Sequence, residues 1–258
     1  MEKLRLNTAF VGREYYFFDK VDSTNAWLLE NSSRLSHGCV AVAACQTQGR
    51  GRRGRAWQDA PGQGLYCSVL LKRLSSETFS LLPVSASLAV CRSLFSLSGA
   101  RPQIKWPNDV LFFGKKVCGI LCEGVQDGEG LSAVCGIGVN LLQETSYFQE
   151  RELSHAGSLL TQTGISSKPE ELLPLLLEEL EKVLHQQETQ GFSSLRGEYR
   201  SNCVTLGKEV LCIQGDSSRQ GKALDIDEEG RLVCRFAKGV EAVASGEVSV
   251  RGLYGYVD

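Results

Sequence analysis

The stretch that says most about the fold is residues 103–140, which read QIKWPNDVLFFGKKVCGILCEGVQDGEGLSAVCGIGVN. Apolar runs alternate here with the turn signals Phe113-Gly114-Lys115 and Asp127-Gly128. That alternation is typical of strands joined by short turns. We therefore predict four successive strands, over residues 103–106, 109–113, 116–125 and 132–140.

The chain before this stretch predicts a mixture of strands and helices. Asp22 and Ser23 are good N-caps for a helix over residues 25–30. A longer helix is predicted over residues 80–97, with Pro83 in its first turn and Gly99 just past its end. Short apolar runs predict strands over residues 15–21, 40–44 and 65–71.

The chain after this stretch begins with one more helix, predicted over residues 172–185. Ser167 and Glu170 form a capping box before it, and Gly191 closes it. Pro174 predicts that this helix starts late or is kinked.

From Val204 the sequence changes character and predicts only short strands, separated by a hairpin turn over residues 227–230. About 55 residues of closely spaced strands fit a small barrel packed on the larger part. The sequence thus predicts domains over residues 1–203 and 204–258. The expected tail strands are residues 207–213, 219–226, 231–236 and 246–250.

Composition excludes several classes of protein. The 258 residues carry a net charge of -2, with 42% hydrophobic and 22% charged residues, which is an ordinary globular balance. A non-specific nucleic-acid binder usually has an excess of basic charge. No apolar run of about 18 residues appears, since the longest candidate, residues 81–97, is broken by a proline, an arginine and serines. We therefore expect no membrane span, and the N-terminus shows no secretory signal.

The ten cysteines are expected to be free thiols in a reducing cytoplasm. They form no CxxC pair, and most lie in apolar runs. Only three histidines are present, and none are clustered, so a zinc site is not expected.

The densest functional signal is GRGRRGRAW, residues 49–57. Four arginines within six residues repel one another unless an anion lies between them, and glycines let the backbone approach a ligand. Arginine matches phosphate and carboxylate oxygens with a planar fork of donors. The motif therefore indicates a phosphate-binding loop that orders around its ligand, although a solvated basic loop or a nucleic-acid tract explains this stretch equally well.

Four further motifs are weaker when each is taken alone. KWPND at 105–109 ends a strand, but Pro-Asn-Asp is also ordinary turn chemistry. GKKVCGI at 114–120 brings a lysine into an apolar strand, and DSTN at 22–25 is explained by helix capping alone. GIGVN at 136–140 lacks the GxGxxG pattern of a dinucleotide site.

Together, in this order, these motifs resemble those of the biotin protein ligases, also called biotin–[acetyl-CoA-carboxylase] ligases, along nearly the whole chain. The resemblance implies an α+β fold, with a mixed β-sheet catalytic domain flanked by helices and followed by a small SH3-like β-barrel. Because DSTN begins at residue 22, it also implies the monofunctional type, without an N-terminal DNA-binding domain.

The reaction implied by this resemblance has two steps. Biotin and ATP form biotinyl-5′-AMP, and the biotinyl group then passes to a lysine of a biotin carboxyl carrier protein. The resemblance implies catalytic roles for Lys116, Arg52 and Asp109. It places biotin against Ser23, Thr24, Asn25, Gln46, Gly49, Arg50, Gly51, Arg52, Lys116, Gly119 and Ile120. It places ATP and the adenylate against Arg50, Arg52, Arg53, Arg55, Trp57, Lys105, Asn108 and Asn140.

Other features follow only from the resemblance or stay open. Mg²⁺ is expected with ATP, with Asn108 and Asp109 as candidate ligands. Asp109 either helps to deprotonate the acceptor lysine or holds the turn after Pro107. The protein is expected to be cytoplasmic, a monomer or homodimer, and not to bind DNA. The alternatives are a lipoate–protein ligase of the same superfamily and a nucleic-acid-binding module.

Overall fold

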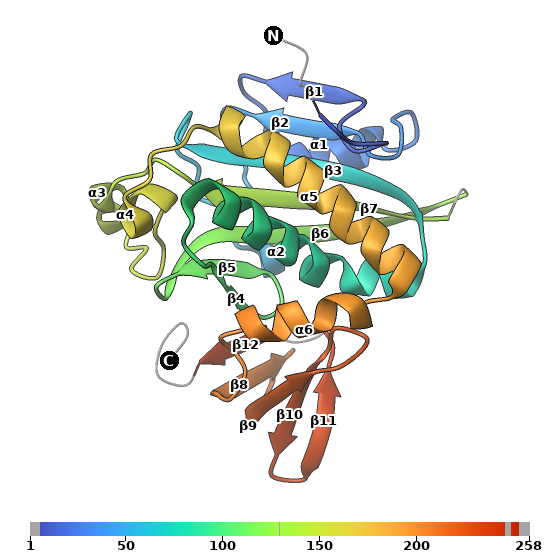
Figure 1. The fold of residues 1–258 in the computed structure, drawn as a ribbon, viewed down its shortest axis with the longest axis vertical. Helices are drawn as coiled ribbons and strands as arrows, with labels where there is room; N and C mark the ends of the chain where they lie inside the picture. Colours follow the sequence, from blue (N-terminus) through green and yellow to red (C-terminus); the bar gives the residue numbers. More distant parts are fainter. Residues whose placement is uncertain (1–5, 129, 246–248, 253–258) are drawn as a thin grey trace.

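The computed structural model describes residues 6–128, 130–245 and 249–252, and its strands form two sheets (Figure 1). The larger sheet has seven strands in the order β1-β2-β3-β7-β6-β5-β4. β1 and β2 are parallel and all other neighbours are antiparallel, so the sheet is mixed as predicted. Its strands are β1 (Tyr15–Phe18), β2 (Val40–Ala43), β3 (Gly64–Leu74), β4 (Gln103–Lys105), β5 (Asp109–Phe112), β6 (Lys115–Asp127) and β7 (Gly130–Asn140).

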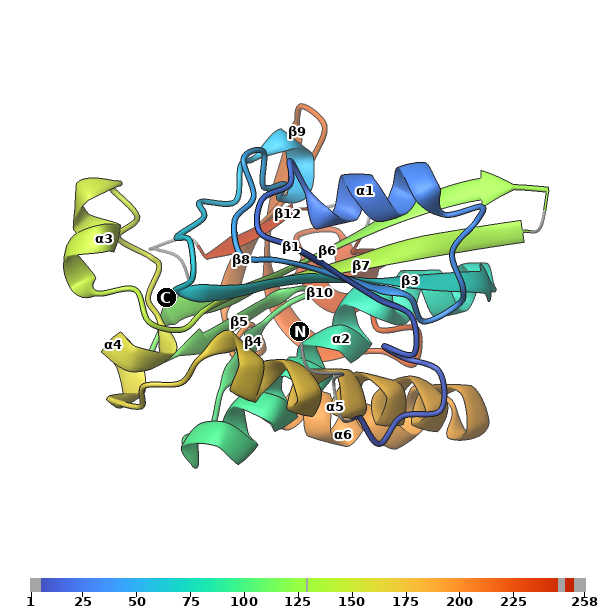
Figure 2. The same cartoon turned by 90° about the horizontal axis from the view of Figure 1, so that it is seen from above.

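Helices cover both faces of this sheet. α2 (Ser76–Ser98) and α5 (Pro169–Gln190) pack on one face and on each other, whereas α1 (Thr24–Asn31) packs on the opposite face against β2, β3 and β7. Figure 2 shows α1 above the sheet and the two long helices below it. The α2–α5 face therefore holds the main apolar core, and the α1 face is only partly covered by helix.

The predicted start of α2 is wrong. Ser75 caps the helix by accepting a hydrogen bond from the backbone N–H of Thr78, so the helix begins four residues before the predicted residue 80. Pro83 consequently lies inside the helix instead of in its first turn. Gly99 ends the helix in a left-handed conformation (φ 69°), as predicted. By length and composition α2 would span a membrane, but 67% of its apolar window is buried inside the protein.

The predicted cap of α5 is shifted by one residue. Glu171, and not Glu170, reaches back to the N–H of Lys168 at 2.9 Å and accepts from the hydroxyl of Ser167 at 2.8 Å. The helix starts early, with Pro169 at its first position, and continues through Pro174, so the expected late start is not seen.

Other differences concern short elements. β1 ends at Phe18, three residues before the predicted end, and Val21 makes only an isolated bridge to Gln46. Three short helices were not predicted, α3 (Thr145–Glu150), α4 (Leu159–Thr163) and α6 (Ser193–Asn202).

The second sheet is antiparallel, with the order β11-β10-β9-β8-β12, and α6 lies between it and the larger sheet (Figure 1). β11 was not predicted, and part of the expected strand at 246–250 lies outside the described residues. Over the described residues the sheet is open, so the expected barrel is not seen closed. Its strands are β8 (Glu209–Gln214), β9 (Ser217–Ile226), β10 (Leu232–Phe236), β11 (Gly239–Val243) and β12 (Ser249–Gly252).

Trp106 joins the two sheets, which confirms that the tail packs on the larger part. Its indole Nε1 donates to the carbonyl of Gly230 at 2.9 Å, and its backbone N–H donates to the hydroxyl of Thr205 at 3.0 Å. The side chain is 1% exposed. The motif KWPND therefore lies where both sheets meet.

The cysteines are free thiols, as predicted. Burial raises the pKa of several of them, including Cys67 and Cys118, well above the ordinary range. Across the described part of the chain, no three His, Cys, Asp or Glu side chains gather as metal ligands.

Candidate active site

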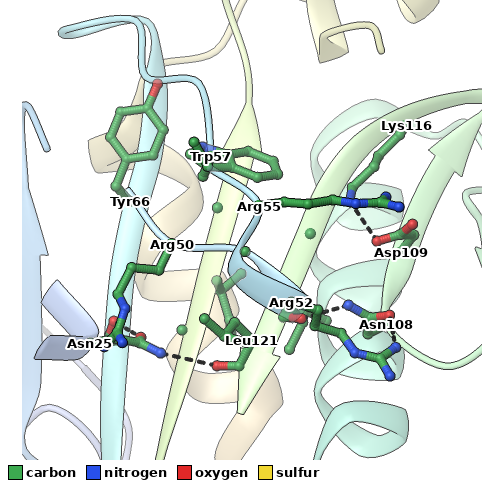
Figure 3. Close-up of a pocket in the computed structure, with 18 of the residues that line it drawn as sticks. Asn25, Arg50, Arg52, Arg55, Trp57, Tyr66, Asn108, Asp109, Lys116 and Leu121 are labelled. Carbon is green, nitrogen blue, oxygen red and sulfur yellow. Dashed lines mark hydrogen bonds and ion pairs between the residues drawn. The ribbon is translucent and has the colours of Figure 1, made fainter. Parts of the chain in front are cut away.

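A cavity of about 530 Å³ opens on the α1 face of the larger sheet. That volume suits a small-molecule ligand. The start of α1 forms one wall, the arginine motif forms a second, and β3, β6 and β7 form the floor (Figure 3). Five sequence motifs that are far apart in the chain therefore meet at one place.

The arginine motif is a tight hairpin. The backbone N–H of Gly51 donates to the carbonyl of Arg55 at 2.7 Å, and that of Trp57 donates to Gly49 at 2.9 Å. A 3-10 turn over Arg52–Gly54 forms the tip. Gly49 is needed for the close approach of the two arms, because a Cβ there would lie 2.7 Å from the Trp57 carbonyl oxygen. Backbone bonds thus fix the base of the hairpin, while its arginines project from it.

The tip of the hairpin contacts both sheets. Arg52 Nη1 donates to Asn108 Oδ1 at 3.0 Å, and Arg52 Nη2 donates to the carbonyl of Ser245. Arg53 Nη2 donates to the carbonyl of Ile213, at the end of β8, at 3.2 Å. Burial lowers the pKa of Arg52, while the charge of Asp109 acts in the opposite direction. The hairpin therefore lies over the cavity, and contacts with Asn108 and with the C-terminal part of the chain hold its tip there.

Asn108 holds the turn that follows Pro107. Its side-chain Nδ2 donates to the backbone carbonyl of Ile120 at 2.7 Å, and its backbone carbonyl accepts from the Ile120 N–H at 3.0 Å. The Trp106–Pro107 peptide bond is cis. Asn108 therefore helps to hold the turn, and the role of Asp109 stays a prediction.

A β-bulge aims Lys116 into the cavity. Val110 and Leu111 of β5 pair with Cys118 and Lys116 of β6, so Val117 is an extra residue on β6. Val117 and Cys118 are both fully buried in the core, while Lys116 lines the cavity. Bulges often redirect a side chain beside an active site. Without this bulge, strand alternation would send Lys116 into the core.

Asp109 and Lys116 form an ion pair inside the cavity. Asp109 Oδ1 lies 2.6 Å from Lys116 Nζ, and the two side chains are 14% and 26% exposed. Figure 3 shows both groups beside the Arg55 side chain. Lys105, at the end of β4, is 8% exposed and lines the same wall. This end of the cavity therefore gathers positive charge.

Three glycines make the floor flat. A Cβ at Gly119 or Gly138, which pair across β6 and β7, would lie 2.7 Å from the Trp57 indole. A Cβ at Gly136 would lie 2.1 Å from Asn25 Oδ1. The GIGVN motif is thus a floor on which two side chains rest, and not a phosphate loop.

The end of the cavity at α1 is lined by hydroxyls and amides, and the one charged side chain that reaches it, Arg50, is paired with Glu123 (Figure 3). Thr24 donates from its backbone N–H to Gln46 Oε1 at 2.9 Å, and its hydroxyl lies 2.7 Å from that of Ser68. Ser68 in turn donates to Asn25 Oδ1 at 2.6 Å. Ser23 caps α1 and also lines the cavity. These small buried groups are arranged to recognise a small polar ligand head.

Comparison with known proteins identifies the family. The model of the Biotin/lipoate A/B protein ligase family matches residues 17–140, and that of the Biotin protein ligase C terminal domain matches residues 205–251. The Biotin--[acetyl-CoA-carboxylase] ligase of Paracoccus denitrificans is 35% identical over 90% of this chain and 99% of that protein. The chain belongs to the biotin protein ligases.

A second ligase of this name, from Mycobacterium tuberculosis, is 32% identical over 88% of this chain and 85% of that protein. The solved structure "Biotin protein ligase from Aquifex aeolicus in complex with biotin and ATP" matches with a TM-score of 0.81 and 31% identity, covering 93% of this chain and 99% of that one. These matches favour biotin over lipoate.

All the site residues predicted for this biotin protein ligase line the cavity except two, Gly49 and Asn140. Gly49 shapes the hairpin instead. Asn140 Nδ2 donates to the Gly157 carbonyl at 3.0 Å, and its Oδ1 accepts from Gln143. Its contact with an adenylate therefore stays a prediction.

Several lining residues were not predicted, and the main ones are Tyr66, Ser68, Leu121 and His155. A serine within the apolar run YCSVLL was a usable signal for Ser68, which is fully buried. The others carried no signal, because their place in the cavity depends on strand pairing.

Proposed function

We propose that this biotin protein ligase makes biotinyl-5′-AMP and transfers the biotinyl group to one lysine of a biotin carboxyl carrier protein. In the first step an oxygen of the biotin carboxylate attacks the α-phosphorus of ATP, and pyrophosphate leaves. In the second step the acceptor amine attacks the acyl carbon, AMP leaves, and the amine gives up a proton.

The observation that carries the proposal is the division of one cavity into a cationic end and a neutral polar end. Among the described residues, Asp109 is the only carboxylate in its lining, against six cationic side chains, although the whole chain has a charge of -2. The cationic residues are Arg50, Arg52, Arg53, Arg55, Lys105 and Lys116. Biotin and ATP are both anions, so fixed cations between them offset their repulsion.

The neutral end suits the ureido head of biotin. That head has one acceptor oxygen and two N–H donors on an apolar body, and it needs a few convergent polar groups. Ser23, Thr24, Asn25 and Gln46 supply them, with the backbone of Arg50 and Gly51 closing over the ligand. Gly119 and Ile120 line the wall beside the biotin chain.

Lys116 is the proposed contact for the biotin carboxylate and the α-phosphate, since the bulge aims it into the cavity at the cationic end, beside Asp109. Arg52 would hold the adenylate from the hairpin tip. Arg53, Arg55, Trp57, Lys105 and Asn108 complete the proposed nucleotide site.

Asp109 has three proposed roles. Its position beside Lys116 keeps that ammonium oriented, and in the second step a carboxylate there would receive a proton from the acceptor lysine, whose ordinary pKa of about 10.4 leaves it protonated at neutral pH. Mg²⁺ usually takes one or two carboxylates together with substrate phosphates, and Asp109 would supply a carboxylate, whereas Asn108 Oδ1 accepts from Arg52 here and would have to give up that bond to join it. The metal would neutralise phosphate charge.

We further propose residues 1–203 as the catalytic domain and residues 204–258 as a separate C-terminal domain. The separate matches over residues 17–140 and 205–251 support this division. The contacts of Arg52 and Arg53 with the C-terminal part indicate that this domain helps to hold the hairpin closed.

The first test is pyrophosphate release from ATP, measured with biotin, with lipoate and with neither. Release that depends on biotin alone supports the proposal. Release with lipoate but not biotin would assign the protein to lipoate ligation, and release with neither ligand would contradict adenylate formation.

A further inference from the structure

We infer that Glu123 fixes the direction of the hydrogen bonds in the biotin-head pocket and ties the arginine hairpin to that pocket. The inference rests on the proposed function and names a positioning residue. Glu123 does not line the cavity, so it acts only through the side chains that it holds.

Glu123 touches one residue of the pocket and one of the hairpin. It lies on β6, two residues beyond Leu121, and its side chain is 24% exposed. Its Oε2 accepts a hydrogen bond from Asn25 Nδ2 at 2.9 Å, and its Oε1 lies 3.3 Å from Arg50 Nη1. Asn25, by contrast, is only 4% exposed. A partly exposed charge thus reaches into a buried neutral network.

The carboxylate fixes which way the Asn25 amide faces. An ionised carboxylate only accepts hydrogen bonds, so the amide nitrogen of Asn25 must point toward Glu123. The carbonyl of Leu121, at 3.2 Å from the same nitrogen, requires the same orientation (Figure 3). Asn25 Oδ1 is then left facing Ser68.

The orientation continues along the network. A serine hydroxyl has a single proton, and Ser68 must give it to Asn25 Oδ1, 2.6 Å away. The Ser68 oxygen is therefore an acceptor toward the hydroxyl of Thr24, 2.7 Å away. Gln46 is oriented at the far end, because its Oε1 accepts from the Thr24 N–H. The Thr24 hydroxyl also lies 3.1 Å from Gln46 Oε1, so its single proton is shared between Ser68 and Gln46, whereas Asn25, Ser68 and Gln46 each have one assignment.

This fixed direction is what a ureido head needs. Its oxygen accepts and its two N–H groups donate, so a network that reversed even one amide would place like groups together and leave a buried polar atom unpaired. A glutamine at position 123 could accept or donate, so one of the two acceptors that hold the Asn25 amide nitrogen would no longer select its orientation, and the longer bond to the Leu121 carbonyl would have to hold it alone. Glu123 therefore contributes to discrimination between ligand heads as well as to affinity.

The same carboxylate anchors the hairpin. Arg50 and Gln46 are four residues apart on one segment, and both are held by this network, Arg50 through Glu123 and Gln46 through Thr24. Occupation of the head pocket and closure of the hairpin are thereby linked through one side chain.

The test measures calorimetric binding of biotin and of iminobiotin, whose ring carries an imine N–H donor where biotin has its acceptor oxygen, in the absence of ATP. We expect Glu123→Gln to raise the Kd for biotin about 10- to 100-fold. The ratio of the Kd for iminobiotin to the Kd for biotin should fall about 10-fold. In steady state the KM for biotin should rise, while kcat and the KM for ATP stay near wild type. An unchanged preference in Glu123→Gln would overturn the inference.

The matched control is Glu241→Gln, which breaks an Arg–Glu pair on the second sheet, where Glu241 Oε2 lies 2.7 Å from Arg219 Nη1. It should bind biotin and iminobiotin as tightly as wild type does. A loss of affinity in Glu241→Gln as large as that in Glu123→Gln would also overturn the inference. If wild type itself binds no biotin, the proposed function fails first.

A second variant separates orientation from simple loss of structure. Asn25→Asp sets two carboxylates side by side. It should bind biotin more weakly than Glu123→Gln or the double variant does. Adding Glu123→Gln restores one amide–carboxylate pair, with Ser68 still the donor, and should recover at least about 10-fold in affinity. A double variant no tighter than Asn25→Asp alone would show that Glu123 does not act by orienting its neighbour.

Discussion

The two faces of the seven-stranded sheet differ in what they bury. The face under α2 and α5 is packed with aliphatic side chains, and Leu82, Leu88, Leu176 and Leu180 are fully buried there. The α1 face buries hydroxyls, amides and glycines beneath a cationic hairpin, with only a smaller apolar cluster around Leu28, Leu70 and Val134. The same three strands, β3, β6 and β7, supply both, so stability and ligand chemistry are separated by strand alternation.

β3 shows this separation residue by residue. Leu65, Cys67 and Val69 belong to the main core, while the side chains of Tyr66 and Ser68 hydrogen-bond in and beside the cavity. A substitution on one face should therefore change the free energy of unfolding and spare the chemistry, and a substitution on the other should do the reverse. The following predictions test that division.

The largest effect is expected from Lys116→Ala. Removing the cation that faces both anions should slow adenylate formation by about 1000-fold or more, with little change in thermal unfolding. Lys116→Arg should restore only part of the rate, because the wider guanidinium does not replace a compact ammonium. Biotin-dependent pyrophosphate release measures both.

Lys115→Ala is the control for this prediction. Lys115 donates to the Ser154 carbonyl at 2.6 Å, outside the cavity, and should keep near wild-type activity. Pyrophosphate release at the wild-type rate in Lys116→Ala would refute the assignment of Lys116.

The opposite face is tested by Leu176→Ala. This fully buried residue of α5 packs in the core, and its truncation should lower the free energy of unfolding by about 2–5 kcal/mol. Denaturant unfolding measures the loss, and kcat per folded molecule should stay unchanged. A kcat that falls with stability would mean that the two faces are coupled.

A smaller effect is expected from Arg52→Gly at the hairpin tip. The variant should still form biotinyl-5′-AMP but release it about 10-fold faster, since it loses the contacts with Asn108 and the Ser245 carbonyl. Escaped adenylate would then acylate bystander lysines. Equal dissociation rates of the adenylate from variant and wild type would show that the tip does not retain the intermediate.

The smallest effect is expected from removing the charge of Glu181, which contributes to stability and not to the proposed chemistry. Glu181 of α5 accepts from the backbone N–H groups of Ala9, Phe10 and Val11 at 2.5, 2.8 and 2.9 Å. Burial raises the pKa of Glu181, but these bonds outweigh it and the net pKa is lowered. A lowered pKa stabilises the fold above the unfolded-state pKa, and that contribution is lost as the pH falls through the folded value.

Glu181→Gln should therefore lower the free energy of unfolding by about 1 kcal/mol at neutral pH. The difference from wild type should shrink as the pH falls below about 4, where the unfolded carboxyl becomes protonated first and the folded carboxyl follows at its lower pKa. Unfolding curves at neutral and acid pH measure it, and a difference independent of pH would contradict the role of the charge.

Local signals predicted much of the fold and the charged end of the site. The turns after Phe112 and at Asp127 and the left-handed Gly99 are encoded within a few residues, and each was found in the expected place. The arginine motif was predicted only as a loop, and its hairpin form was not. The capping residues of α2 and α5 were not predicted correctly, because residues next to Ser75 and Glu171 are equally good caps by sequence.

Features that depend on pairing between distant segments could not be predicted. The bulge at Val117 exists only relative to β5, and strand alternation alone would have sent Lys116 into the core. Asn25, Ser68 and Glu123 lie far apart in the sequence and each reads as an ordinary cap, strand or surface residue. Only the folded sheet brings them into one network.

The most direct test of the central claim is mass spectrometry of a biotin carboxyl carrier domain incubated with this protein, biotin and ATP. The account predicts a biotin-sized mass increase on one lysine with wild type and with Leu176→Ala, and none with Lys116→Ala. No mass increase with wild type, or the same increase with Lys116→Ala, would contradict the claim that the α1 face of the sheet carries out biotin ligation.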